Sequence, residues 1–216
     1  MSATIHQPVA AASQSLPRLA NRPGTAAKAR SGADAASRSG IWVAVFTITM
    51  SFAALTSALF VREGSGGDWV HFALPSILYA NTFALLLSSV TLELARRTAT
   101  AKPLIDSESV PLINLWLFLT LILGFSFLAG QYEAWRQLAS QGLYLATNPN
   151  CSFYYVLTAM HGLHVIGGIA ALVFVMGRLA GTHAAFRRST FESTVIYWHF
   201  MGVLWLYVLL VLRTKL

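Results

Sequence analysis

The charged residues of this chain are confined to short segments, and this distribution most constrains what the chain can fold into. All fifteen basic and eight acidic residues lie outside five uncharged stretches. A helix needs roughly 20 apolar residues to cross the hydrocarbon core of a bilayer, so each stretch is long enough to do so. The pattern excludes a soluble globular enzyme, and it lacks the alternating ~10-residue segments of a β-barrel. The five stretches are residues 39–61, 69–92, 109–132, 137–177 and 193–212.

We therefore predict an all-α, polytopic membrane protein with five transmembrane helices in a domain covering residues 41–216. The turn at 64–68 between the first two helices is short, so we expect these helices to form a hairpin. The other three helices would form a separate bundle, with a V-shaped, lipid-filled cleft between the two units. The helices are expected at about 41–62, 71–96, 110–134, 151–179 and 191–213.

The remaining residues, 1–40, are expected to be a disordered cytoplasmic tail, because they are rich in Ala and Ser and contain no aromatic residue. Their Arg- and Ser-rich composition also fits a mitochondrial transit peptide. The tail and the second and fourth loops carry eleven Lys or Arg residues, against four on the other side. The positive-inside rule then places the N-terminus in the cytoplasm. The net charge of +7 does not indicate nucleic-acid binding, because the basic residues flank apolar spans.

Histidines in the last two predicted helices are the main candidates for chemistry. His161 and His164 lie in the fourth helix, and the fifth contains Tyr197-Trp198-His199. One interpretation is that His164 and His199 ligate a haem from two helices. A second is hydrogen bonding between helices, in which His161 or His164 bonds a polar group on a neighbouring helix. A third is proton handling, since ionisable groups inside a membrane are costly and often functional.

Two acidic residues at helix ends have alternative interpretations. Glu93 precedes Arg96 and Arg97 by three and four residues, a spacing that favours ion pairs on a helix. It could instead be a proton-collecting carboxylate, and Glu133 near the end of the third helix has the same two interpretations. The two arginines could bind a phospholipid head group or simply anchor the helix at the interface. The single cysteine, Cys151, excludes a disulfide framework and a cysteine-ligated metal site.

Four segments resemble subunit III of haem–copper oxidases in its five-helix form. The fourth helix carries Phe-Tyr-Tyr-Val-Leu-Thr-Ala-Met-His-Gly-Leu-His-Val-Ile, and the fifth carries Phe-Glu, then Tyr-Trp-His-Phe and Trp-Leu-Tyr. The second contains Leu-Leu-Ser-Ser-Val-Thr, and the third ends in Gln-Tyr-Glu. The resemblance covers roughly residues 40–216. The segments lie within 153–166, 191–207, 81–91 and 131–133.

This resemblance implies a non-catalytic subunit that binds no metal and no haem of its own. In the family, subunit I holds the haems and copper and subunit II receives electrons, whereas subunit III packs on subunit I, holds phospholipid and sustains proton uptake. It also implies a location in the bacterial inner membrane, where the count of basic residues and the odd number of helices put the C-terminus on the periplasmic side. The electron donor could be cytochrome c or quinol. Alternatives are an accessory subunit of nitric oxide reductase or a haem b-binding membrane anchor.

One position departs from the family pattern. The family typically carries a membrane-buried glutamate in its first helix, where this chain reads Thr47-Ile48-Thr49. Ile48 takes the glutamate position, so a proton role for that carboxylate is not expected here. The departure also favours a divergent branch of the family.

Overall fold

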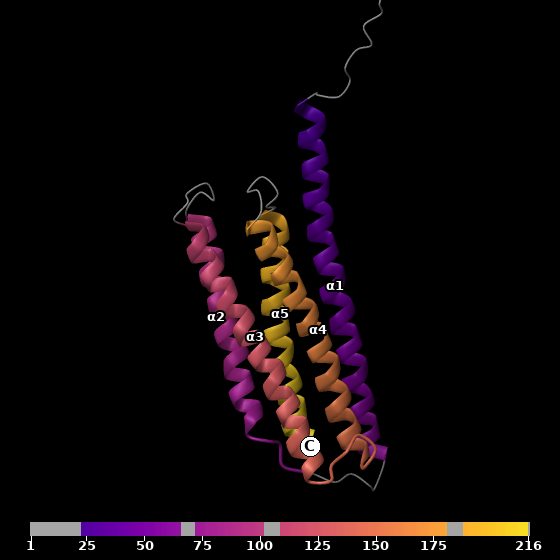
Figure 1. Ribbon diagram of the computed structural model, residues 1–216. Helices are drawn as coiled ribbons and strands as arrows, with labels where there is room; N and C mark the ends of the chain where they lie inside the picture. Colours follow the sequence, from indigo (N-terminus) through magenta and orange to yellow (C-terminus); the bar gives the residue numbers. More distant parts are fainter. Residues whose placement is uncertain (1–22, 66–71, 102–108, 181–187, 216) are drawn as a thin grey trace, which may run out of the picture.

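The structure, a computed structural model, describes residues 23–65, 72–101, 109–180 and 188–215, and all of its regular structure is helical (Figure 1). Each of the five helices contains a segment long and apolar enough to cross a membrane. The prediction of an all-α fold with five transmembrane helices is confirmed. The helices are α1 (Pro23–Ser65), α2 (Ile77–Ala101), α3 (Ser109–Ser140), α4 (Pro149–Ala180) and α5 (Arg188–Lys215).

The helix ends differ most from the prediction in α1 and α2. The helical backbone of α1 already begins at Pro23, so it includes residues 23–40 of the predicted tail. These residues are rich in alanine, the strongest helix former, and the segment suited to cross the membrane begins only at Ser39. Residues 1–22 of the predicted tail lie outside the described residues. The start of α2 moves from 71 to Ile77, because Pro75 disfavours helical backbone in the residue before it.

The end of α3 is fixed by a glycine. The amide of Leu143 donates to the carbonyl of Leu138 at 3.1 Å, and the amide of Gly142 donates to that of Ala139 at 3.0 Å. This pair of bonds is a Schellman motif, which needs a left-handed residue after the helix. Gly142 supplies it with a φ of 78°. The chain then turns through residues 141–148 into α4, where Pro149 occupies the first helical position.

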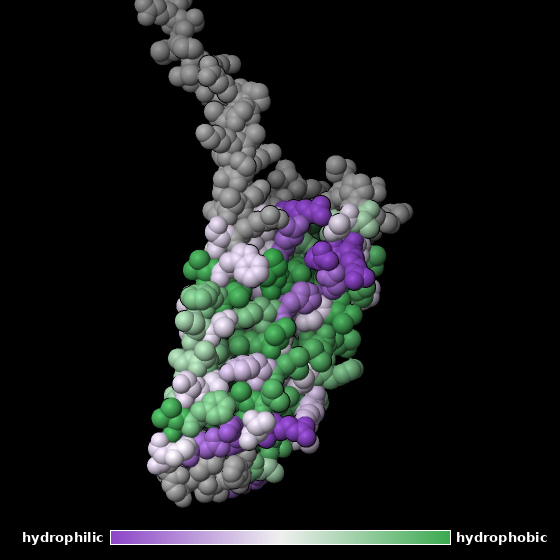
Figure 2. Space-filling view, turned by 180° about the vertical axis from the view of Figure 1, so that it is seen from behind, coloured by the Kyte–Doolittle hydropathy of each residue, from purple (hydrophilic) through white to green (hydrophobic). Residues whose placement is uncertain are grey.

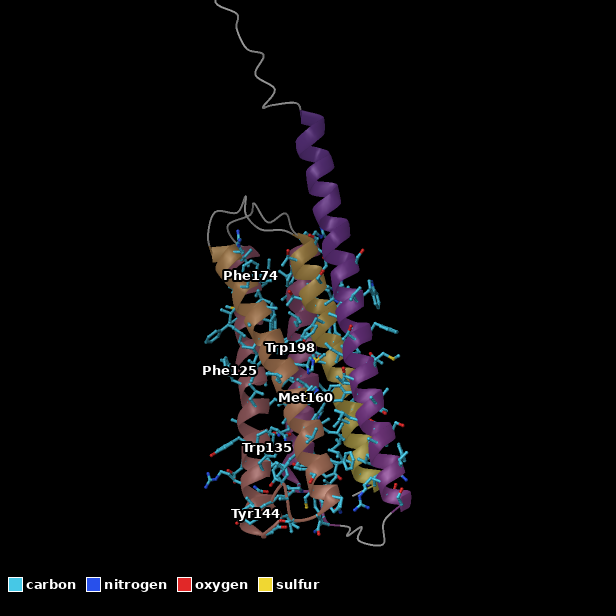
Figure 3. The ribbon with its side chains drawn as sticks, turned by 90° about the vertical axis from the view of Figure 1, so that its right-hand side faces the viewer. Phe125, Trp135, Tyr144, Met160, Phe174 and Trp198 are labelled. Atoms are coloured by element: carbon cyan, nitrogen blue, oxygen red, sulfur yellow. The ribbon has the colours of Figure 1, made fainter. Side chains whose placement is uncertain are left out.

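The bundle is organised around α5, which packs against α1, α2 and α4. The outer contacts continue from α1 to α4, from α4 to α3 and from α3 to α2. The views in Figure 1 and Figure 3 show the resulting arrangement, with α1 and α2 on different sides of the bundle.

The predicted hairpin of the first two helices, and the V-shaped cleft beside it, are therefore wrong. No part of α1 contacts α2 within the described residues, because α5 lies between them. The physical reason is the length of the connection. It covers residues 66–76 and not a turn at 64–68, and an extended chain spans about 3.3 Å per residue, which is enough to cross the face of α5.

Candidate functional site

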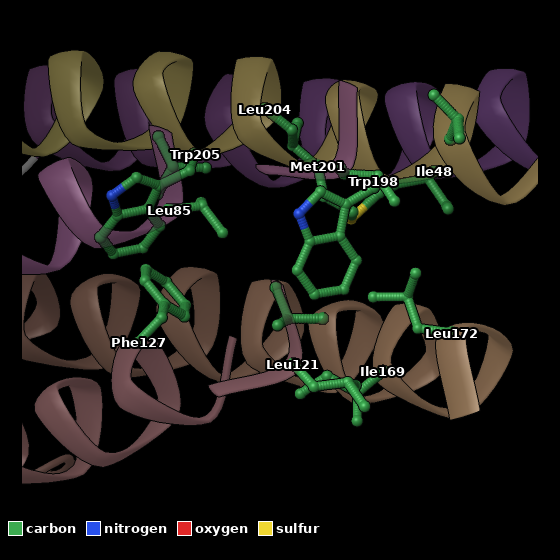
Figure 4. Packing of buried hydrophobic residues seen from close by; sticks show 14 of the residues in the cluster. Ile48, Leu85, Leu121, Phe127, Ile169, Leu172, Trp198, Met201, Leu204 and Trp205 are labelled. Atoms are coloured by element: carbon green, nitrogen blue, oxygen red, sulfur yellow. The ribbon is translucent and has the colours of Figure 1, made fainter. Parts of the chain in front are cut away.

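The indole of Trp198 occupies the centre of the bundle. It extends from α5 towards Leu121 and Ile169 (Figure 4) and donates a hydrogen bond from Nε1 to Ser88 Oγ of α2 at 3.0 Å. The ring fits between two glycines. A Cβ added at Gly124 of α3 would lie 2.9 Å from the ring, and one at Gly168 of α4 would lie 3.0 Å from it. Trp198 therefore joins four helices, and only glycine leaves room for it on both sides.

His161 is completely buried among aromatic rings. Its imidazole lies 5.5 Å from the ring of Phe127 on α3 and 5.0 Å from that of Trp205 on α5, measured between centroids. Trp205 in turn donates from Nε1 to Thr82 Oγ1 of α2 at 2.9 Å. Neither ring nitrogen of His161 has a hydrogen-bond partner within the described part of the chain. Its contacts with neighbouring helices are made by the faces and edges of rings.

His164 does not bond a neighbouring helix through its side chain either. Its Nδ1 donates to the carbonyl of Met160 in its own helix at 2.6 Å, and its ring packs on Phe52 of α1 with centroids 6.0 Å apart. The main-chain carbonyl of His164 instead accepts a hydrogen bond from the hydroxyl of Tyr197 at 2.9 Å. The expected imidazole bond between helices is thus replaced by a bond from Tyr197 to the backbone of α4.

His199 points to a different part of the molecule. Its Nε2 lies 3.9 Å from Glu93 Oε2 of α2. The ring of His164 faces α1, and α1 and α2 are separated by α5. The structure therefore does not bring these two imidazoles together. Among the residues that the structure describes, no three His, Cys, Asp or Glu side chains form a group suited to a metal ion.

Glu93 is the centre of a charged cluster at the surface. Its carboxylate accepts two hydrogen bonds from the guanidinium of Arg96, at 2.7 and 2.6 Å, and one from Nε of Arg97 at 3.0 Å. The spacing of three and four residues thus places both arginines on one carboxylate. We call Glu93, Arg96, Arg97 and His199 the polar patch. Strongly polar residues stand out on the otherwise apolar face of the bundle seen in Figure 2.

Glu133 and Ile48, two other positions considered from the sequence, have simpler surroundings. Glu133 pairs with Arg136 at 3.4 Å and accepts from Gln137 at 3.4 Å, one turn further along the same helix. The structure does not join it to the histidines or to Glu93. Ile48, in the position where the resemblance predicts a glutamate, is buried within the apolar core.

Sequence reasoning missed the polar side chains that lie inside the bundle. Thr91 of α2 and Thr120 of α3 form a hydrogen bond of 2.8 Å, and Ser88 receives the indole of Trp198. Helical spacing could have indicated that these residues are buried, because they repeat along the buried faces of their helices. Small polar residues in membrane helices have many partners to choose from, so their pairing cannot be read from spacing.

Comparison with known proteins places the sequence of this chain in one family. The family model for cytochrome c oxidase subunit III matches residues 39–214. A probable cytochrome c oxidase subunit 3 of Nocardia farcinica is 30% identical over 167 residues, which cover 73% of this chain and 77% of that protein. The cytochrome c oxidase subunit 3 of Thermostichus vulcanus is 29% identical, covering 82% and 87%. A probable quinol oxidase subunit 3 of Staphylococcus saprophyticus is 27% identical, covering 78% and 84%. This chain belongs to the cytochrome c oxidase subunit III family of the haem–copper oxidases.

Proposed function

We propose that this chain is the non-catalytic third subunit of a respiratory oxidase that reduces oxygen with proton translocation. In this proposal it packs on subunit I, which holds the haems and copper, within a complex that also contains subunit II. The match to the family over residues 39–214 carries the proposal. The names of the relatives favour an oxidase over a nitric oxide reductase accessory subunit or a haem-binding anchor. Those names include both cytochrome c and quinol oxidases, so the donor depends on the other subunits.

The absence of a redox role for this chain is supported by its donor groups. A haem ligated by two histidines needs two imidazoles that face each other across one space. His161 lies between aromatic rings, His164 donates to its own helix, and His199 faces Glu93. We therefore expect the haem and copper of the complex to be held by its partner subunits.

The polar patch marks the surface that we propose for docking on subunit I. The side chains of Glu93, His199 and Arg96 are 25, 38 and 43% exposed on α2 and α5, within segments suited to cross the membrane. Charged groups that face lipid are costly, whereas a partner helix can offer them hydrogen bonds. Along the same helix as His199, α5 presents exposed apolar side chains such as Val203, one turn further on, and Leu210. A polar group surrounded by apolar surface is suited to a specific contact between membrane proteins.

The arginines of the patch can also take part in lipid binding. A guanidinium has five N–H donors, and Glu93 uses only two from Arg96 and one from Arg97. We propose that the remaining donors bind a phospholipid phosphate at the cytoplasmic side, with the N-terminus cytoplasmic and the C-terminus periplasmic in a bacterial inner membrane. Native mass spectrometry of the complex, with both arginines changed to Gln, should show less retained phospholipid. Arg136→Gln, at the other end of the bundle, is the matched control.

Site-specific photo-crosslinking tests the docking surface. A photoreactive phenylalanine analogue is placed at Val203 on α5, which is 65% exposed, or at Phe125 on α3, which is 56% exposed and points away from the bundle (Figure 3). We expect Val203 to crosslink to subunit I and Phe125 to give no subunit crosslink. The reverse pattern would refute the docking surface alone. If the tagged chain isolated no haem-containing subunit at all, the proposed function itself would be wrong.

A further inference from the structure

The buried polar side chains of the bundle differ in whether they are paired. In the middle, Thr91 bonds Thr120 and Trp198 bonds Ser88. Nearer the end that carries the 141–148 connection, four buried side chains contain six polar atoms without a hydrogen-bond partner in the described residues. They are Nδ2 of Asn81, both amide atoms of Gln131, the hydroxyl of Tyr154 and both ring nitrogens of His161. We call these four residues the buried polar cluster.

The members of the buried polar cluster come from three helices, and Asn81 and Tyr154 both lie against the part of α3 that carries Gly130 and Gln131. Asn81 of α2 lies directly against the backbone of α3 at Gly130, where a Cβ would overlap with it. The Tyr154 side chain of α4 reaches Gln131 of α3, although their polar atoms do not meet in hydrogen-bond geometry. Each of the four residues is at most 4% exposed, so bulk solvent does not reach them.

Helical spacing on α3 and α4 places His161 near the other members of the buried polar cluster. Phe127 and Gln131 are four residues apart and share the buried face of α3, and Phe127 contacts the ring of His161. On α4, Tyr154 and His161 are seven residues apart, about 10 Å along the helix. Because α3 and α4 run in opposite directions, Gln131 lies at a level between these two side chains.

The chemistry of the unpaired atoms identifies the missing partner. Asn81 offers a donor, Gln131 a donor and an acceptor, and Tyr154 and a neutral His161 each can do both. A cation would need acceptors only, and an anion would need donors only. Water both donates and accepts, and a buried water typically makes about three hydrogen bonds, so six atoms correspond to about two molecules. We propose that the buried polar cluster is a binding site for ordered water between α2, α3 and α4.

Direct pairing of the side chains is the competing explanation, and it falls short. A small rotation could join the Tyr154 hydroxyl to Gln131. It would leave both nitrogens of His161 unpaired, because Phe127 and Trp205 flank that ring. A buried polar group without a partner is rare in native proteins, and ordered water is the usual partner where side chains do not provide one. His161 therefore still lacks hydrogen-bond partners if the other side chains rotate, and water can provide them.

Radiolytic hydroxyl labelling of the purified oxidase complex tests the site, because bound water delivers the radical to buried side chains beside it. We expect Tyr154 to be modified faster than Phe52, an equally buried aromatic residue that packs on His164 outside the buried polar cluster. His161→Phe combined with Gln131→Leu should lower the rate at Tyr154. Equal rates for the two aromatic residues in the wild-type complex would overturn the proposal. A cryo-electron microscopy map that showed all six atoms bonded to protein groups would overturn it as well, and both wild-type measurements remain decisive if the variant does not assemble.

Discussion

Gly168→Ala should destabilise the bundle, because the new methyl group has no space beside Trp198. The Cβ would lie 3.0 and 3.1 Å from two carbons of the indole and 3.2 Å from the ring of Tyr197. Favourable carbon contacts lie at about 3.5–4.0 Å. The indole cannot retreat, because its far edge already meets Gly124 and its Nε1 is bonded to Ser88. The clash must therefore be absorbed by the helices.

The magnitude follows from two opposing effects. Overpacking of a tight core costs about 1–3 kcal/mol. Replacing glycine by alanine within a helix gains up to about 1 kcal/mol. We expect Gly168→Ala to lower the free energy of unfolding by up to about 2 kcal/mol, as measured by SDS titration of the purified chain in mixed micelles with circular dichroism.

Gly177→Ala is the matched control, since it lies in the same helix and its Cβ would have nothing within 4 Å. It carries the same gain in helix propensity without the clash, so it should leave the free energy of unfolding unchanged or raise it. In a Trp198→Leu background the difference between the two alanine variants should shrink, because the indole is gone and only the contact with Tyr197 remains. If Gly168→Ala and Gly177→Ala had the same effect with Trp198 present, the packing argument would be refuted.

Three further predictions concern separate contacts. Thr91→Val or Thr120→Val removes a hydrogen bond between α2 and α3, which should cost about 0.5–1.5 kcal/mol by the same titration, with coupling in the double variant. Lys215→Met breaks the 2.9 Å ion pair with Glu63 that joins the end of α5 to α1, and it should lower stability by less than about 1 kcal/mol and increase hydrogen exchange there. The chain purified without its partners should show no Soret band, and a band that disappeared in His164→Ala would contradict the proposed function.

The sequence predicts the helices well because membrane burial imposes one rule on every span. Uncharged length alone locates the five membrane-crossing segments of the described residues, and no helix in that part of the chain is missed. The neighbours of each helix were not predictable in the same way. The predicted hairpin of α1 and α2 depended on a short turn between them. In the structure α1 ends at Ser65 instead of residue 62, and α2 begins at Ile77 instead of residue 71. A few residues of extra connection allow a different packing order.

For the same reason, contacts within one helix of the candidate site could be predicted from the sequence, whereas contacts between helices could not. The contacts of Glu93 with Arg96 and Arg97 depend only on helical spacing, so they can be predicted from the sequence. The surroundings of His161 depend on which residues of α3 and α5 reach it. Its neighbours turned out to be Phe127 and Trp205, so it packs as an aromatic ring and not as an interhelical hydrogen-bond donor. Residue type alone could not distinguish these two uses of an imidazole.

The neighbouring residues Trp198 and His199 show why one short motif serves two purposes. Consecutive residues on a helix point about 100° apart, so one of them can face the core while the next faces outwards. Trp198 is buried and bonds Ser88, whereas His199 is 38% exposed and faces Glu93. Changes at Trp198 should therefore act on the stability of the chain itself, and changes at His199 on the proposed association with subunit I. A His199→Ala variant that unfolded as readily as Trp198→Ala would show that this division is wrong.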